Sequence, residues 1–256
     1  MQENSITLLG TGTSVGIPMV GCKCEVCLSP DIEDKRLRTS AFVVFEGKYF
    51  LIDIGPDFRE QALRNQINKI DAILLTHPHR DHIGGFDDIR GLNFVQDKSI
   101  VLFSNTLTLT SLKKQFYYAF DNLEYDAVPK VTSIIIDDEG FDFEGIKIVP
   151  IHVMHGNMPC LGYRFGNMAY LTDVNFIPES EFEKLKDLDV LILDSLRIKQ
   201  HPSHFSLKES LNVSARIGAK KTYFIHISHH MGRHRTMQPH LPENVFFGID
   251  NQQISF

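Results

Sequence analysis

The 256-residue sequence has no tryptophan, only four cysteines and no apolar run long enough to cross a membrane. The first residues also lack the basic flank and long apolar core of a signal peptide. Disulfide-rich scaffolds are typical of small secreted chains, so four cysteines in 256 residues argue against a disulfide-rich protein. We therefore expect a cytoplasmic protein that does not associate with a membrane.

Positive charge is also in short supply, since 26 Lys and Arg face 32 Asp and Glu, for a formal net charge of −6. This balance gives no general attraction to nucleic acid or anionic lipid, so we expect no nucleic-acid partner. Histidine, in contrast, is abundant, with twelve residues. We expect site chemistry based on imidazole.

Short β-rich runs alternate with amphipathic stretches along the whole chain. The runs predict strands at 6–9, 41–45, 49–52, 72–75, 100–103, 133–136, 146–149, 162–165, 169–171, 190–193 and 222–225, and helices at 57–66, 87–94, 108–119, 179–186 and 206–217. This order predicts an α/β fold of two packed sheets flanked by helices. No linker or repeat divides the sequence, so residues 1–256 are expected to form a single domain.

Three histidines and an aspartate crowd into the segment His77-Pro78-His79-Arg80-Asp81-His82, directly after the predicted strand 72–75. In an extended segment, His77 and His79 project to the same side and can share one metal ion. Asp81 and His82, at the following turn, can reach a second ion. A solvated loop is the alternative, but the spacing favours a metal site.

Two ions need more ligands than this segment supplies, and three other predicted strands end in suitable residues. His155 follows the run that begins at 146, Asp173 follows 169–171, and His226 follows 222–225. A carboxylate can bridge two cations, whereas a neutral imidazole cannot, so Asp173 is the natural shared ligand. Each residue alone could simply be a hydrogen-bonded strand end, but together they complete a site.

Three of the four cysteines, Cys22, Cys24 and Cys27, lie in a short loop at about 21–28. In a reducing compartment they predict a structural zinc site, which needs a fourth ligand. Spacing alone leaves Cys160, His229 and His230 as candidates. Free loop thiols are the alternative interpretation.

The motif Thr76-His77-Pro78-His79-Arg80-Asp81-His82-Ile83-Gly84-Gly85, with His155, Asp173 and His226, resembles the metallo-β-lactamase superfamily of binuclear metallohydrolases. The resemblance runs from the Gly10-Thr11-Gly12 turn to His226. It implies an αββα sandwich with two mixed sheets, two divalent ions (zinc or manganese), and Asp53 as a structural residue beneath the site. One ion would take His77, His79 and His155, the other would take Asp81, His82 and His226, and Asp173 would bridge them. The aspartate and histidine at 173 and 82 depart from the β-lactamases of this fold, which disfavours β-lactam hydrolysis.

Within the superfamily, the thiol triad resembles that of the cyclic phosphodiesterases of carbon–phosphorus lyase pathways. That resemblance implies His229, three residues after His226, as the fourth ligand of the structural zinc. A member of quinone-cofactor biosynthesis shares the triad but lacks the intact histidine motif. The resemblance also assigns His204 as a general acid or phosphate contact, and we take Asp81 and His204 as catalytic residues.

These residues predict a binuclear metal-dependent phosphodiesterase that attacks a small cyclic or nucleotide-like phosphate ester through a metal-bridging hydroxide. The alternatives are an RNA 3′-end-processing endonuclease, a thiolester or acyl hydrolase, and a non-catalytic nucleotide-binding protein. The expected partner is a small phosphate-ester substrate. The sequence is also compatible with a homodimer.

Overall fold

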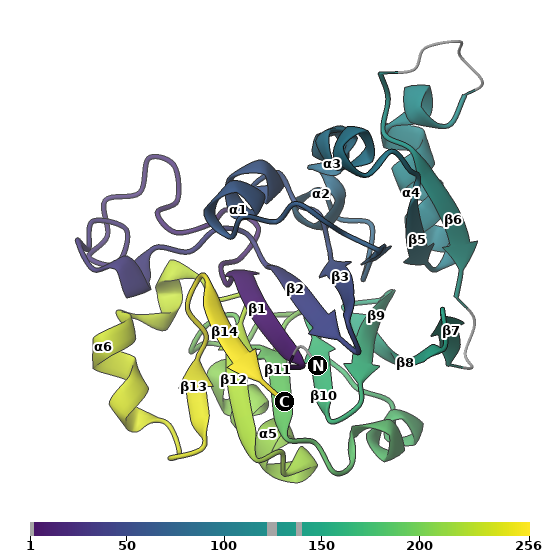
Figure 1. Ribbon diagram of the computed structural model, residues 1–256. Helices are drawn as coiled ribbons and strands as arrows, with labels where there is room; N and C mark the ends of the chain where they lie inside the picture. The colour runs from purple at the N-terminus through teal and green to yellow at the C-terminus, as the bar shows by residue number, and fades with distance from the viewer. Residues whose placement is uncertain (1–2, 122–126, 137–139) are drawn as a thin grey trace.

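Two seven-stranded sheets form the centre of the computed structural model, which describes residues 3–121, 127–136 and 140–256 (Figure 1). The first sheet has the order β14-β1-β2-β3-β4-β5-β6, with β1 Ser5–Gly10, β2 Ser40–Phe45, β3 Lys48–Ile52, β4 Ala72–Leu74, β5 Ile100–Ser104, β6 Val131–Ile135 and β14 Gln252–Ser255. The second has the order β13-β12-β11-β10-β9-β8-β7, with β7 Phe141–Phe143, β8 Ile146–His155, β9 Met158–Phe165, β10 Met168–Leu171, β11 Val190–Asp194, β12 Lys221–Ile225 and β13 Val245–Phe247.

Both sheets are mixed in the same way. Strand β1 pairs antiparallel with β14 and β2, and β2 with β3, whereas β3 to β6 run parallel. In the second sheet β7 to β10 are antiparallel and β10 to β13 are parallel. In parallel pairs the strands end at the same sheet edge, so residues that follow successive strands can meet there.

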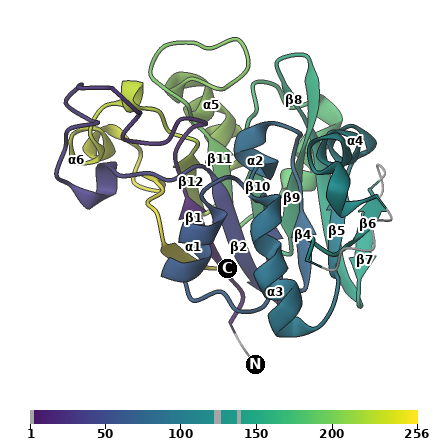
Figure 2. The ribbon, with the colours of Figure 1, turned by 90° about the horizontal axis from the view of Figure 1, so that it is seen from above.

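Helices cover the outer faces of the two sheets (Figure 2). The α-helices are α1 Phe58–Arg64, α2 Arg80–Ile83, α3 Ile89–Gln96, α4 Thr106–Gln115, α5 Leu207–Ile217 and α6 His234–Met237. Short 3-10 helices are η1 Ile32–Asp34, η2 Phe86–Asp88, η3 Tyr117–Ala119, η4 Glu179–Leu185, η5 His229–Met231 and η6 Gln238–His240.

Apolar side chains fill three layers between these elements. The central layer joins the inner faces of the two sheets, for example Phe50 with Phe165, whose ring centroids lie 5.2 Å apart. A second layer packs α1, α3 and α4 on the first sheet, and a third packs α5 and η4 on the second. The expected αββα sandwich of two mixed sheets is confirmed.

Local sequence accounts for several element boundaries. Helix α5 begins at a capping box, in which Ser206 and Glu209 bond each other's backbone, and it ends at Gly218 with a left-handed φ of 71°. The prediction of a helix at 179–186 is wrong in type, because η4 is a 3-10 helix. The strands β7, β13 and β14 were not predicted, and each forms at a sheet edge by pairing with one neighbouring strand.

Candidate metal centre

The candidate site lies at one edge of the two sheets, where several strands end. After β4, the chain leads through His77 to His79, which occupies the N-cap of α2, and α2 then presents Asp81 and His82. His155 ends β8. Asp173 follows β10 and His226 follows β12. Both residues have left-handed backbone angles, with φ values of 52° and 58°.

Three imidazoles form the first group of metal-ligating atoms. His77 Nε2 lies 3.0 Å from His79 Nδ1, and the rings of His79 and His155 lie 5.0 Å apart. His77 and His155 are buried, whereas His79 is exposed at the rim. Their ligand atoms lie within 4.8 Å of one another and of Asp173.

Asp81, His82 and His226 form the second group. His82 Nε2 lies 3.2 Å from Asp81 Oδ2, and His226 Nε2 lies 3.8 Å from the same oxygen. The buried Nε2 atoms of His82 and His226 have no hydrogen-bond partner among the residues that the structure describes. Buried polar atoms are rarely left without a partner, so these atoms fit metal ligands.

Asp173 stands between the two groups and presents one oxygen to each. Its Oδ1 lies 3.2 Å from His82 Nε2 and 3.4 Å from His226 Nε2. Its Oδ2 lies 3.6 Å from His77 Nε2 and 3.9 Å from His155 Nε2. A carboxylate placed in this way can bridge two cations, so the His/Asp clusters fit a binuclear metal site.

Hydrogen bonds to the second ring nitrogens orient these imidazoles. His82 Nδ1 donates to Asp53 Oδ2 at 2.7 Å, and His155 Nδ1 donates to the carbonyl of Ser203 at 2.7 Å. Thr76 Oγ1 donates to Asp53 and accepts from His77 Nδ1 at 2.9 Å. These bonds leave the Nε2 atoms free for a metal, as is usual for histidine ligands. The structural position expected for Asp53, beneath the site, agrees with this arrangement.

Two glycines allow α2 to lie against the loop after β3. A Cβ at Gly85 would meet the carbonyl oxygen of Gly55 at 2.0 Å, and a Cβ at Gly55 would meet that of Asp81 at 2.1 Å. Ile54 N–H donates to the His82 carbonyl at 2.8 Å across this contact. The glycines at 55 and 85 therefore set the position of Asp81 and His82 over the sheet edge.

Opposite charges alternate through the buried site. Burial would lower the pKa of His82, but Asp173, Asp81 and Asp53 outweigh it and raise this pKa well above its usual value. Burial would raise the pKa of Asp173, but the surrounding imidazoles, His226 foremost, hold it well below its usual range. The carboxylates thus create a field that favours a cation.

His204 borders the metal-ligating groups without belonging to either of the two histidine groups that share Asp173. It is buried, its Nε2 lies 3.9 Å from Asp173 Oδ2, and its ring stacks on His226 at 4.6 Å. Its Nδ1 donates to Asp194 Oδ2 at 3.0 Å. Burial would lower the pKa of His204, but Asp194 raises it to about 9. The imidazole can therefore carry a proton next to the site.

Asp194 was not among the residues predicted for the site, although it ends β11 just as Asp173 follows β10. Its Oδ2 accepts from His204 and from the N–H of Val174, and its Oδ1 lies 3.8 Å from His226 Nδ1. The rule that identified Asp173, a carboxylate at the end of an apolar run, would have found Asp194 as well.

The predicted thiol cluster lies next to His229. The Nδ1 atom of this histidine is 3.3 Å from the sulfurs of Cys22 and Cys24 and 3.6 Å from that of Cys27. Ligands around a tetrahedral zinc ion lie about 3.5 Å apart, so the four residues fit a structural metal site. The N–H of Cys27 foremost lowers the pKa of Cys24 to about 6, whereas burial raises that of Cys27 to about 11.

Of the other two candidates for the fourth ligand, neither belongs to this cluster. Cys160 is buried elsewhere, with its sulfur 3.6 Å from the Thr172 carbonyl, and His230 is exposed. The structure thus brings together every residue predicted for the two metal sites and places His204 beside them. Their roles as ligands and catalytic groups stay predictions.

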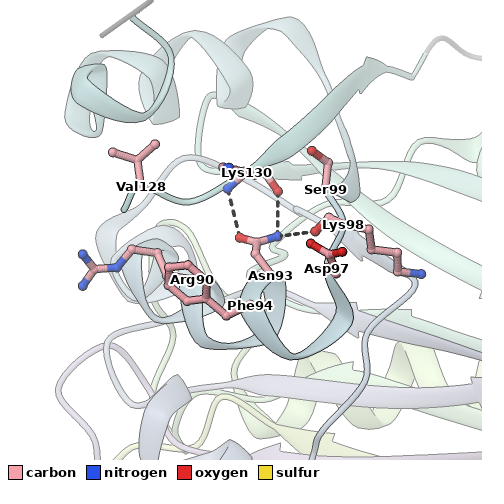
Figure 3. Close-up of a pocket in the computed structure, with 8 residues that line it drawn as sticks. All are labelled: Arg90, Asn93, Phe94, Asp97, Lys98, Ser99, Val128 and Lys130. Carbon is pink, nitrogen blue, oxygen red and sulfur yellow. Dashed lines mark hydrogen bonds between the residues drawn. The ribbon is translucent and has the colours of Figure 1, made fainter. Parts of the chain in front are cut away.

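A separate cavity of about 360 Å³ lies at the end of α3, away from the histidines (Figure 3). Asn93 lines it, but its amide nitrogen already donates to the carbonyls of Lys98 and Lys130. The side chain of Asn93 therefore joins the segments at Lys98 and Lys130.

The fold and the site define a metallohydrolase of the metallo-β-lactamase type. Residues 48–227 match the family described as Beta-lactamase superfamily domain, and the chain belongs to this superfamily. It is 42% identical to a crystal structure described as a new diphosphatase from the PhnP family, with a TM-score of 0.92 over 99% of this chain and 98% of that one.

Curated relatives are longer. The chain is 39% identical to the octanoyltransferase of Porphyromonas gingivalis over 246 residues, which are 95% of this chain and 50% of that protein. Coenzyme PQQ synthesis protein B of Bradyrhizobium diazoefficiens is 33% identical over 101 residues, which are 33% of this chain and 32% of that protein. The chain thus spans about half or less of the length of these relatives.

The helices give no sign of a membrane-spanning segment. Within the described part of the chain, no helix is both long enough and apolar enough to cross a bilayer.

Proposed function

We propose that the protein is a binuclear metal-dependent phosphodiesterase that acts on a small cyclic or nucleotide-like phosphate ester or diphosphate. The observation that carries this proposal is the placement of Asp173, with one carboxylate oxygen facing each histidine group. A pair of cations held in this way would attract the negative charge of a phosphodiester. Bound zinc or manganese would activate a water molecule and neutralise charge on the phosphate.

The protein's own groups would orient the reaction. Asp53, through His82 and Thr76, fixes the imidazoles in the tautomer that leaves Nε2 free. Asp194 positions His204 and keeps it protonated. In hydrolysis of a phosphodiester, an alkoxide leaves and needs a proton, which His204 Nε2 can donate.

Two similarities support a phosphorus substrate. The protein that is 42% identical over nearly the whole chain is described as a diphosphatase, which is the name of an enzyme with a phosphorus substrate. The thiol triad with His229, which the resemblance to cyclic phosphodiesterases implied, also assembles beside this site.

The test uses protein purified with zinc or manganese, bis(p-nitrophenyl) phosphate and a panel of small cyclic phosphates and diphosphates. Metal-loaded protein should release product, and Asp173→Ala should abolish release and lower the metal content. Asp121→Ala, at an exposed aspartate, is the matched control and should retain both. If the metal-loaded protein turns over no phosphodiester or diphosphate, the proposal is wrong.

A second candidate function is hydrolysis of an acyl thiolester or ester, favoured by the 39% identity to an octanoyltransferase. The similar region covers only half of that protein, so its name can describe the other half. Paired metal ions assist attack on carbon as well as on phosphorus. Turnover of an octanoyl thiolester by the metal-loaded chain, without phosphodiester cleavage, would favour this candidate.

A further inference from the structure

An asparagine beside the candidate metal centre joins three segments of the chain. Asn175 Oδ1 accepts from the N–H of Gly156 at 2.7 Å, and its Nδ2 donates to the Pro202 carbonyl at 3.2 Å. Gly156 follows His155 in the turn after β8, and Asn175 itself lies two residues after Asp173. The loop that leads into α5 rises at the same edge of the molecule as this turn (Figure 2). A single amide therefore links the turn, the segment after β10 and the loop.

The loop that receives the second of these bonds, residues 202–205, is fastened on both sides of His204. Before His204, the amide described above holds the carbonyl of Pro202. After His204, the N–H of Phe205 donates to the carbonyl of Val174 at 2.8 Å. Both anchors belong to the segment that follows β10, so the position of His204 depends on that segment.

The same loop orients one of the metal-ligating imidazoles. The Ser203 carbonyl accepts from His155 Nδ1 at 2.7 Å, and His155 Nε2 then faces Asp173 Oδ2 at 3.9 Å. A Cβ at Gly156 would lie 3.4 Å from the Cβ of Ser203, so the turn and the loop lie against each other. A loop that moved would therefore release the ring of His155 from its orientation.

The amide of Asn175 satisfies two backbone groups of opposite character. The N–H of Gly156 needs an acceptor, whereas the carbonyl of Pro202 needs a donor. An aspartate at 175 would present an oxygen to that carbonyl, and an alanine would leave both backbone groups without this partner. The side chain at 175 is thus matched to this junction.

We propose that Asn175 is a positioning residue that couples His155, a metal-ligating residue, to His204, the proton donor. This inference rests on the proposed function, because that function assigns the roles of ligand and donor. With the amide in place, an orientation fixed at His155 also fixes the Ser203 carbonyl and the loop that carries His204. Without the amide, both imidazoles lose their shared support.

Zinc affinity tests the link to His155. In competition with a chelator, Asn175→Ala should bind one active-site ion about 10-fold to 100-fold more weakly than the wild type, the usual effect of groups that orient metal ligands. The matched control is Asn93→Ala, which removes an amide that bonds to the carbonyls of Lys98 and Lys130, away from the histidines. This control should keep the wild-type affinity, and chemical denaturation shows that both variants are folded.

Proton exchange at the His155 ring reports on the loop without any reaction. In zinc-loaded protein with ¹⁵N-labelled histidine, the Nδ1–H signal of His155 is identified by its absence in His155→Gln. It should exchange slowly with water in the wild type, because the Ser203 carbonyl accepts it. Exchange should be several times faster in Asn175→Ala and in the isosteric Asn175→Asp, which loses only the donor, and unchanged in Asn93→Ala.

Kinetics with saturating zinc test the link to His204. Asn175→Ala should lower kcat on a phenyl phosphodiester by about tenfold or more with little change in KM, and should lower kcat on the p-nitrophenyl ester less. If no ester is cleaved but Asn175→Ala alone weakens zinc binding and speeds exchange, the positioning of His155 stands and the proposed function fails. Wild-type zinc affinity and exchange in Asn175→Ala, or equal losses in Asn93→Ala, would overturn the positioning role.

Discussion

Individual residues in the candidate metal centre adopt backbone angles that most side chains avoid. Asp53, Asp173 and His226 have φ values of 60°, 52° and 58°. Left-handed angles cost a non-glycine residue on the order of 1 kcal/mol or more and persist only where the surrounding structure enforces them. Here the angles follow strand ends and turn three side chains toward one point, so the strain accompanies the site geometry.

Asp194 shows how one carboxylate can organise several groups. It accepts from His204 Nδ1 and from the N–H of Val174, next to Asp173, while its other oxygen faces His226. The imidazole of His204 and the backbone next to Asp173 are therefore positioned by a single side chain, whose second oxygen lies near His226 without a hydrogen bond to it. Such outer groups commonly govern the activity of metal sites.

The role of His204 can be tested through the leaving group. His204→Gln should slow hydrolysis of a phenyl phosphodiester by about 10²-fold to 10⁴-fold, because phenolate needs a proton more than p-nitrophenolate does. The loss for the p-nitrophenyl ester should be much smaller. Steady-state kinetics on both esters, with metal content checked by mass spectrometry, measure the difference. Equal losses on the two esters would show that His204 does not donate the proton.

At the scale of elements, close contact between α2 and the loop after β3 holds half of the histidine motif in place. Gly55 and Gly85 permit this contact, because a Cβ at either position would lie about 2 Å from a backbone oxygen of the other segment. Gly85, at the end of the histidine motif, is thus explained by packing.

Gly85→Ala should therefore destabilise the fold by about 2 kcal/mol or more, because backbone must move to admit the methyl group. Gly91→Ala is the matched control, since a Cβ at Gly91 in α3 meets nothing within 4 Å. That substitution should be neutral or stabilising, as alanine favours helix. Chemical denaturation of the two variants measures both effects, and equal stabilities would contradict the packing argument.

The thiol cluster joins the loop that follows β1 to the segment after β12. Ile227 N–H donates to the Thr11 carbonyl, and Thr13 N–H donates to the Ile227 carbonyl, between His226 of the candidate metal centre and the cluster residue His229. A metal ion in the thiol cluster would thus stabilise the strand end that carries His226.

Cys24→Ser should lower the metal content by about one ion per chain and reduce the melting temperature, since a structural zinc site contributes directly to folding. Cys160→Ala, at the buried cysteine outside the cluster, should keep the full metal content. Metal analysis and thermal unfolding provide the two readouts. An unchanged metal content in Cys24→Ser would show that the thiols hold no ion.

At the scale of the whole molecule, a polar network ties the two ends of the chain together. Asp250 Oδ1 accepts from the N–H and hydroxyl of Thr11, and its Oδ2 accepts from the N–H of Leu37 at 2.6 Å. The buried Arg36 donates to Thr11 Oγ1 and to the Gly248 carbonyl. This network holds residues 248–250 against Thr11 and against residues 36–37.

Burial raises the pKa of Asp250 to about 6, although hydrogen bonds from Leu37 and Thr11 lower it. An aspartate in an unfolded chain titrates near about 3.9. The folded carboxyl therefore binds its proton more tightly, so its contribution to stability is greatest below about pH 4, declines as the pH rises to about 6 and is constant above that. The decline amounts to at most about 3 kcal/mol.

Asp250→Asn removes this titration. Between pH 4 and 6 the wild type should lose free energy of unfolding relative to the variant, whatever the constant offset caused by the lost acceptor. Urea denaturation at several pH values measures the difference. A wild type that instead gains stability relative to Asp250→Asn over this interval would show that the folded pKa is not raised.

Residue types and their spacing along the chain indicated the chemistry of the candidate site. The spacing of His77, His79, Asp81 and His82 and the carboxylate after 169–171 indicated two metal ions, and alternating runs indicated two sheets. These signals are local, because ligand type and strand periodicity are properties of short segments. The same rule applied to the end of β11 would have found Asp194.

Contacts between segments far apart in sequence came from the packing of the two sheets and their loops. This packing selected His229 over Cys160 and His230 as the neighbour of the thiols, turned the two oxygens of Asp173 toward different histidine groups, and paired the short strands β7, β13 and β14. It also placed the ring of His201 5.2 Å from that of His204. Spacing along a chain does not give these contacts, because they arise when the sheets pack and bring together strand ends far apart in sequence.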